Sequence, residues 1–223
     1  MGNLENEHWT VRQEMARNKS APAGVLERLA GDGDWMVRKE LAGNPSAPAG
    51  ALERLARDPR WEVRRAVARN KSAPAGALER LAGDGDWMVR ESVANHPSTP
   101  ARALERLAGD GEWPVRLEVA KHPNTPAEAL ERLAGDENRL VRMEAAKNPQ
   151  MPTRALVGMC RDRDAGVRRA VAKALVERLD EIPQDPALWL ALWEAADKEW
   201  RARIVEHPYG QMVAVLAGLS CPR

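Results

Sequence analysis

The chain has 223 residues, and its 34 lysines and arginines are balanced by 33 aspartates and glutamates, for a net charge of +1. This balance argues against a protein that holds nucleic acid through bulk positive charge. Two cysteines, Cys160 and Cys221, provide neither a disulfide framework nor the spacing of a metal site. The start of the chain is polar rather than signal-like, and no apolar run is long enough for a membrane span. We therefore predict a soluble, cytoplasmic protein without a cofactor.

A 26-residue repeat organises most of the chain. Tryptophan recurs at this period from Trp9 to Trp113, and the arginine three residues after it recurs further, at Arg12, Arg38, Arg64, Arg90, Arg116, Arg142 and Arg168. A fixed period between 20 and 50 residues indicates a solenoid, in which each unit buries its apolar face against its neighbours. We predict about seven units over residues 1–173, the first one partial, and an irregular helical C-terminal cap continuous with them over residues 174–223.

Each unit is expected to contain two short helices. The first begins at a recurring proline such as Pro22, carries the sequence ALERLA, and ends at a glycine in the left-handed conformation, as at Gly31 and Gly83. Thr99 and Thr125 are expected to cap this helix, the latter in a capping box with a glutamate.

The second helix is expected to begin at a recurring aspartate. Asp58 is predicted as its N-cap, with Pro59 as the first helical residue. Apolar residues then follow at the spacing of inward-facing helical positions, which predicts a core that includes Val37, Leu41 and Ala42.

These repeats resemble the leucine-rich repeat variant family, over residues 9–173. The segments that carry the resemblance include VRRAVARNKSAPAGALERLAGDGDWM (Val63 to Met88) and NTPAEALERLAGDENRLVRMEAAKNP (124–149). The resemblance implies an all-α, right-handed superhelix of alternating α and 3₁₀ helices without a sheet. Some members of the family carry an N-terminal iron–sulfur domain with a cysteine cluster. Only eight residues, none of them cysteine, precede the first repeat here, so that function is not expected.

The recurring arginines have two interpretations. They could form an anion-binding series, or each could bond the aspartate or a carbonyl group of its own or the next unit. The constant spacing of Asp58 and Arg64 is similar to that of HEAT repeats, whose paired aspartates and arginines link neighbouring units, and it favours the second interpretation. The predicted structural ladder comprises Asp32, Arg38, Asp58, Arg64, Asp84, Arg90, Asp110, Arg116, Asp136 and Arg142.

Other candidate sites are weak. The motif GDGDW, which occurs twice, lacks the further oxygen ligands of a calcium loop, so Asp34 and Asp86 are expected to cap helices. His96 and His122 stand where other units have asparagine and are expected to be turn residues, while Cys160 is expected to be buried. No nucleophile–base motif, phosphate-binding loop or zinc motif is present, so we predict neither an enzyme nor a metal site.

Three positions of the second helix vary freely between units and lie three and then four residues apart, so they form one stripe on the face away from the core. The stripe is Thr10/Met36/Glu62/Met88/Pro114/Leu140/Gly166, Gln13/Lys39/Arg65/Glu91/Leu117/Met143/Arg169 and Arg17/Gly43/Arg69/Asn95/Lys121/Lys147/Lys173. Eight of its 21 residues are basic and two are acidic, for a local net charge of +6.

The stripe predicts a non-catalytic scaffold that binds another protein. The expected contact residues are Arg65, Arg69, Leu117, Lys121, Met143 and Lys147. The alternative is a HEAT-like protein that binds nucleic acid, or acts on DNA, through the basic part of the stripe. It is less favoured because the basic residues lack interleaved aromatic side chains. A structural module without a dedicated ligand is also open, since cations near the end of a helix suit its dipole in any case.

Overall fold

The computed structural model describes residues 7–216 and 218, and within them every regular element is a helix. The prediction of an all-α solenoid of two-helix, 26-residue units is therefore confirmed. The chain divides into two compact units, Met1–His122 and Pro123–Arg223. None of the described helices is long and apolar enough to cross a membrane.

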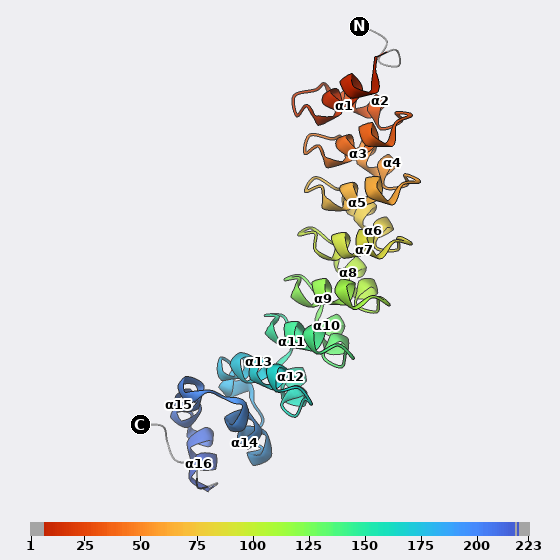
Figure 1. The fold of residues 1–223 in the computed structure, drawn as a ribbon. Coiled ribbons are helices and arrows are strands. Elements are labelled where there is room, and N and C mark those ends of the chain that lie inside the picture. Colours follow the sequence, from red (N-terminus) through yellow and green to blue (C-terminus); the bar gives the residue numbers. More distant parts are fainter. Residues whose placement is uncertain (1–6, 217, 219–223) are drawn as a thin grey trace. The chain divides into compact units, whose positions relative to one another are not determined.

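In the first unit, long and short helices alternate. The long helices pack side by side in chain order, and the short helices form a second layer behind them (Figure 1). The long helices are α1 (Trp9–Arg17), α3 (Trp35–Gly43), α5 (Trp61–Arg69), α7 (Trp87–Ala94) and α9 (Trp113–Lys121). The short helices are α2 (Ala23–Leu29), α4 (Ala49–Leu55), α6 (Ala75–Leu81) and α8 (Ala101–Leu107).

The second unit continues the repeat and then departs from it. The repeated helices are α10 (Ala127–Leu133), α11 (Arg139–Lys147), α12 (Thr153–Met159) and α13 (Ala165–Val176). A 3₁₀ helix, η2 (Leu179–Glu181), follows, and then come α14 (Pro186–Ala195), α15 (Lys198–Glu206) and α16 (Pro208–Leu216). The boundary predicted between residues 173 and 174 falls inside α13, so the division into solenoid and cap stays a prediction.

The core is a line of small and branched apolar side chains between the two helix layers. Val37, Leu41 and Ala42 of α3 are fully buried, as predicted, and Leu26 and Leu29 of α2 face them from the short-helix layer. A seven-residue helix such as α2 is too short to be stable alone. Burial of each leucine, worth about 1.5–3 kcal/mol, is what holds it in place.

The short helices begin one residue later than predicted. Pro22 is the N-cap of α2 and lies outside the helix, and its carbonyl oxygen accepts from the amides of both Val25 (2.8 Å) and Leu26 (3.2 Å). The first bond is of the 3₁₀ type and the second of the α type, and the second makes these helices α rather than 3₁₀. Thr99 and Thr125 are not N-caps either, because a proline occupies that position after each of them.

The long helices begin two residues later than predicted. Arg60, not Asp58, is the N-cap of α5, and Pro59 lies outside the helix. A carboxylate oxygen of Asp58 instead accepts from the amide of Arg60 at 2.9 Å, which forms a turn ahead of the helix. In the units that carry GDGDW, Asp34 and Asp86 cap their helices as expected.

The glycines after the short helices are not left-handed caps. Within the described residues, positive φ occurs at Gly218, while the residue that ends α2, Ala30, is right-handed. A Cβ atom on Gly31 would lie 2.5 Å from a guanidinium nitrogen of the exposed Arg54 side chain in the next repeat, which can move aside, and Cβ atoms on Gly109 and Gly135 would make only ordinary contacts. The structure therefore does not explain why glycine recurs here.

Candidate interaction surface

Five of the recurring arginines link one repeat to the next. Arg64 donates from Nε and Nη2 to the two carboxylate oxygens of Asp84, at 2.6 and 2.7 Å, and from Nη1 to the carbonyl oxygen of Asp58 at 2.8 Å. The same two-pronged contact joins Arg12 to Asp32, Arg38 to Asp58, Arg90 to Asp110 and Arg142 to Asp162. Arg116 donates from Nη1 to the carbonyl oxygen of Asp110. Arg142 likewise donates from Nη1 to the carbonyl oxygen of Asp136. The role of these five arginines is therefore structural, because each binds the aspartate of the next repeat.

At Asp84, the hydrogen bonds and partner charges outweigh the cost of burying the carboxylate. Burial alone would raise the pKa of Asp84, but the hydrogen bonds from Arg64 and from the amide of Asp86, with the charges of Arg64 and Arg90, hold that pKa below its ordinary value. Asp84 is therefore ionised throughout the physiological pH range.

A second connection runs through the residue that follows each long helix. Nδ2 of Asn70 donates to the carbonyl oxygens of Ala42 and Asn44, at 2.7 and 2.9 Å. His96 and His122 occupy the same place, with Nε2 3.0 Å from the carbonyl oxygens of Asn70 and His96 respectively. The imidazole nitrogen substitutes for the amide nitrogen, so the histidines are turn residues that also join repeats. Spacing alone did not reveal this second role.

The predicted contact residues fall into two groups. Arg65, Arg69, Leu117 and Lys121 lie in the first unit, while Met143 and Lys147 lie in the second. The third-column residues Arg69, Lys121 and Lys147 are exposed, and the second-column residues Arg65, Leu117 and Met143 are half-buried. All six are accessible, but not as one described surface.

An acidic column that sequence reasoning passed over lies beside the stripe: Glu14, Glu40, Ala66, Ser92, Glu118, Glu144 and Ala170. Four of these seven residues are glutamate, which lowers the net charge of the face from +6 to +2. Lys121 pairs with Glu118, and Lys147 with Glu144, each at 2.8 Å. Recurrence of glutamate one residue after the second column was the available signal.

Arg69 escapes this pairing because the acidic column is interrupted beside it. Arg17, its counterpart two repeats earlier, pairs with Glu40 at 2.8 Å, but the residue that corresponds to Glu40 is Ser92. The residue three positions before Arg69 is also uncharged, Ala66. Arg69 consequently has no hydrogen-bond or ion-pair partner among the described residues.

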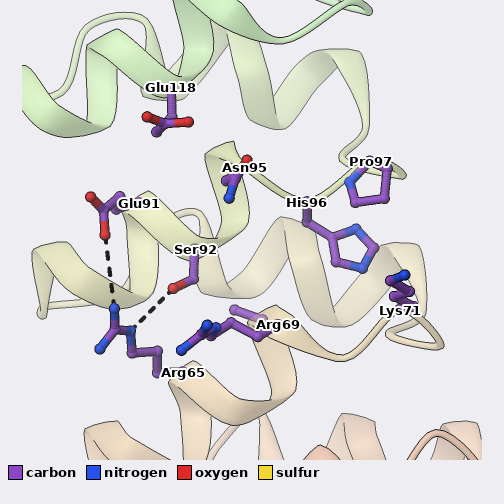
Figure 2. Close-up of a pocket in the computed structure, with 10 residues that line it drawn as sticks. Arg65, Arg69, Lys71, Glu91, Ser92, Asn95, His96, Pro97 and Glu118 are labelled. Carbon is purple, nitrogen blue, oxygen red and sulfur yellow. Dashed lines mark hydrogen bonds and ion pairs between the residues drawn. The ribbon is translucent and has the colours of Figure 1, made fainter.

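A cavity of about 360 Å³ opens at this point, between α5 and α7. Figure 2 shows Arg65 and Arg69 on one side of it, and Glu118 of the following repeat on the other. Arg65 is held loosely, with Nε 3.3 Å from Oγ of Ser92 and Nη2 4.0 Å from the carboxylate of Glu91. Lys71, which also lines the cavity, has no partner among the described residues.

The recurring tryptophans border the stripe. Trp87 and Trp113 are 38% and 42% exposed, which is high for so large an apolar side chain. Nζ of Lys39 lies 5.9 Å from the centre of the Trp35 ring. The expectation that the basic residues lack neighbouring aromatic side chains is therefore wrong at Lys39. The tryptophan precedes the second stripe column by four residues, which places both on one side of the helix.

Residues 35–60, 61–86, 87–112 and 113–138 each match the sequence pattern named leucine-rich repeat variant. Residues 35–138 therefore consist of leucine-rich repeat variant repeats. A solved structure described as "a leucine-rich repeat variant with a novel repetitive protein structural motif" is 29% identical to it, with a TM-score of 0.58 over 96% of this chain and 88% of that one. The predicted resemblance is thus confirmed.

Two further similar solved structures have lower sequence identity to this chain. The Escherichia coli protein YIBA is 18% identical, with a TM-score of 0.47 over 96% of each chain. An engineered protein is 19% identical, with a TM-score of 0.45 over 97% of this chain and 78% of that one. No curated protein matches the sequence.

Proposed function

We propose that the chain is a non-catalytic repeat scaffold that binds another protein through the stripe, and that the cavity between α5 and α7 is the centre of this contact. The observation that carries the proposal is the presence of two cations, Arg69 and Lys71, without partners on the wall of a cavity in the predicted binding face. Elsewhere in the stripe, Arg17, Lys121 and Lys147 have their own carboxylates.

The partner segment that fits this cavity is acidic. An aspartate or glutamate side chain would give Arg69 the pairing that Glu40 gives Arg17, and its second oxygen would reach Arg65 or Lys71. Charge-assisted bonds of this kind are the strong ones in interfaces. Leu117 and Met143 add half-buried apolar surface in their respective units, and the bordering tryptophans add the aromatic area that interfaces favour.

The acidic column weighs against nucleic acid. Within Met1–His122, the stripe and the acidic column together contain five basic and five acidic residues, a balance that gives a polyanion no net attraction.

The test is a pull-down from a lysate of the source cells with the wild-type chain and the double variant Arg69→Glu/Lys71→Glu, each with and without nuclease. The matched control is Lys19→Glu, because Lys19 lies in the same sequence, NKSAP, two repeats earlier. We expect a discrete protein that survives nuclease treatment, whose affinity falls about tenfold or more in the double variant and is unchanged in the control.

Two results would contradict the proposal. Recovery that disappears with nuclease would assign the face to nucleic acid. Equal affinity of the double variant for the recovered protein would remove the cavity from the contact.

A further inference from the structure

The last arginine of the ladder, Arg168, is oriented like the others but holds no carboxylate. Its Nη1 donates to the carbonyl oxygen of Asp162 at 2.8 Å, as Nη1 of Arg142 does to Asp136. In the described pairs, the ladder aspartate follows its arginine by 20 residues, and residue 188 is a leucine. Among the described residues, nothing is bonded to Nε or Nη2 of Arg168.

The helices after the last repeat do not replace the missing aspartate. Asp197 precedes α15 and is the nearest analogue of a ladder residue, but it is used elsewhere. One of its carboxylate oxygens accepts from the amide of Trp200 at 3.1 Å, and the other lies 3.7 Å from Nη2 of the neighbouring arginine, Arg169. The guanidinium of Arg168 is therefore fixed through Nη1, while its Nε and Nη2 have no partner among the described residues.

Arg168 lines a cavity of about 490 Å³ between α13 and α14. Arg161 and Arg169 also line this cavity, and Glu194 is the one acidic residue among the lining residues. The excess of positive charge favours an anion. The rest of the lining from α14 is apolar and includes Ala187, Leu190 and Ala191. A volume of this size suits a small molecule or the end of a peptide.

We propose that this cavity is a binding site for a carboxylate attached to a small aliphatic group, with Arg168 as the residue that grips the carboxylate through Nε and Nη2. The ladder itself gives the geometry, since five arginines of this chain hold planar carboxylates by those two nitrogens at 2.5–3.2 Å. The aliphatic group lies against Leu190 and the alanines of α14. The site is in the second unit and does not depend on the proposed function of the first.

The chemistry admits two sources, a free short-chain fatty acid or the C-terminal carboxylate of a peptide. The full chain is titrated with hexanoate, with an N-acetylated tetrapeptide that ends in leucine with a free carboxylate, and with the amidated form of the same peptide. Calorimetry gives the affinity, and the Nε–Hε resonance of Arg168 in a ¹⁵N spectrum reports whether that nitrogen is engaged. Preference for hexanoate or for the free peptide identifies the source, and the amidated peptide is expected not to bind.

Three variants locate the site. Arg168→Lys keeps the charge but removes the planar fork, and it should weaken binding about tenfold or more. Ala191→Phe fills the cavity without changing the arginine and should also abolish binding, while Arg203→Lys, at an exposed arginine of α15, should have no effect. Circular dichroism checks that each variant is folded.

The proposal is overturned if neither carboxylate binds, or if the folded Arg168→Lys and Ala191→Phe variants bind like the wild type. Inorganic phosphate that competes as well as the carboxylate would also overturn it, since the site would then recognise charge and not the planar group.

Discussion

Replacement of Asp84 by alanine tests whether the ladder, and not the apolar core alone, holds neighbouring repeats together. The substitution removes the two bonds from Arg64, at 2.6 and 2.7 Å, and the bond from the amide of Asp86 at 2.9 Å. Arg64 keeps its bonds to the carbonyl oxygens of Asp58 and Pro59, and its side chain is 18% exposed, so water reaches part of the guanidinium that loses its partner.

The expected loss follows from these contacts. A hydrogen bond to a charged group contributes about 1.5–3 kcal/mol, and all the bonds lost are to the ionised carboxylate of Asp84. We take the lower end of this range, about 1.5 kcal/mol, once for the pair with the partly hydrated Arg64 and once for the amide bond, which gives a total of about 3 kcal/mol. For a chain of this size, that corresponds to a decrease in melting temperature of about 6–12 °C.

Urea unfolding followed by circular dichroism measures the loss, with Asp86→Ala as the matched control. Asp86 caps α7 in the same repeat, through one bond to the amide of Met88, and takes no part in the ladder. Its removal should cost about 1 kcal/mol. If Asp84→Ala costs no more than Asp86→Ala, the bond to Arg64 adds no stability and the reasoning about the ladder fails.

Three further outcomes are expected. Because the folded-state pKa of Asp84 is depressed, its contribution is complete above the unfolded value near 3.9 and is lost as pH falls below it, so the urea midpoint should drop between about pH 5 and pH 3, less steeply in Asp84→Asn. Burial lowers the pKa of His122 in the folded chain, so below about pH 6.5 the unfolded chain binds a proton more readily than the folded chain and the urea midpoint should decrease, and His122→Asn should reduce that decrease between about pH 6.5 and 5.5. Burial raises the pKa of the Cys160 thiol to about 11, so in a Cys221→Ser variant Cys160 should react with a thiol reagent at pH 8 only as fast as the chain unfolds, whereas rapid reaction of the folded protein would contradict its burial.

The fold could be predicted from the sequence because the same pattern of apolar and polar residues recurs in successive repeats. A single valine spacing is weak evidence for a buried face, but Val37, Val63, Val89 and Val115 at one period leave little choice, and all four are fully buried. Helix starts were less predictable. Aspartate is a common N-cap residue, but the carboxylate of Asp58 accepts a hydrogen bond from Arg38. The helix α5 therefore begins at Trp61, two residues after the predicted start at Pro59. The contact between repeats thus outweighs the preference of aspartate for the N-cap position.

The candidate site was harder because it depends on what is missing. The basic column of the stripe is visible in the sequence, but whether a cation in it is available depends on a neighbouring helix. Arg17 and Arg69 occupy the same column, but Arg69 is unpaired because Ser92 stands where Arg17 has Glu40 and because the residue three positions before it is Ala66. Cys221 lies outside the described residues.

If the unpaired Arg69 contacts the partner, a new ion pair to Arg69 within the chain should raise the stability of the fold and lower the affinity for the partner. Ala66→Glu places a carboxylate three residues before Arg69, the arrangement that joins Glu118 to Lys121 at 2.8 Å on α9. Such a pair contributes about 0.2–0.5 kcal/mol to a helix, so the variant should unfold at slightly higher urea concentration. Its affinity for the partner recovered through the cavity should nevertheless decrease, because the new glutamate competes with the acidic segment for Arg69. Unchanged affinity with raised stability would show that the pair forms but that Arg69 is not a contact, and the cavity would lose its role in recognition.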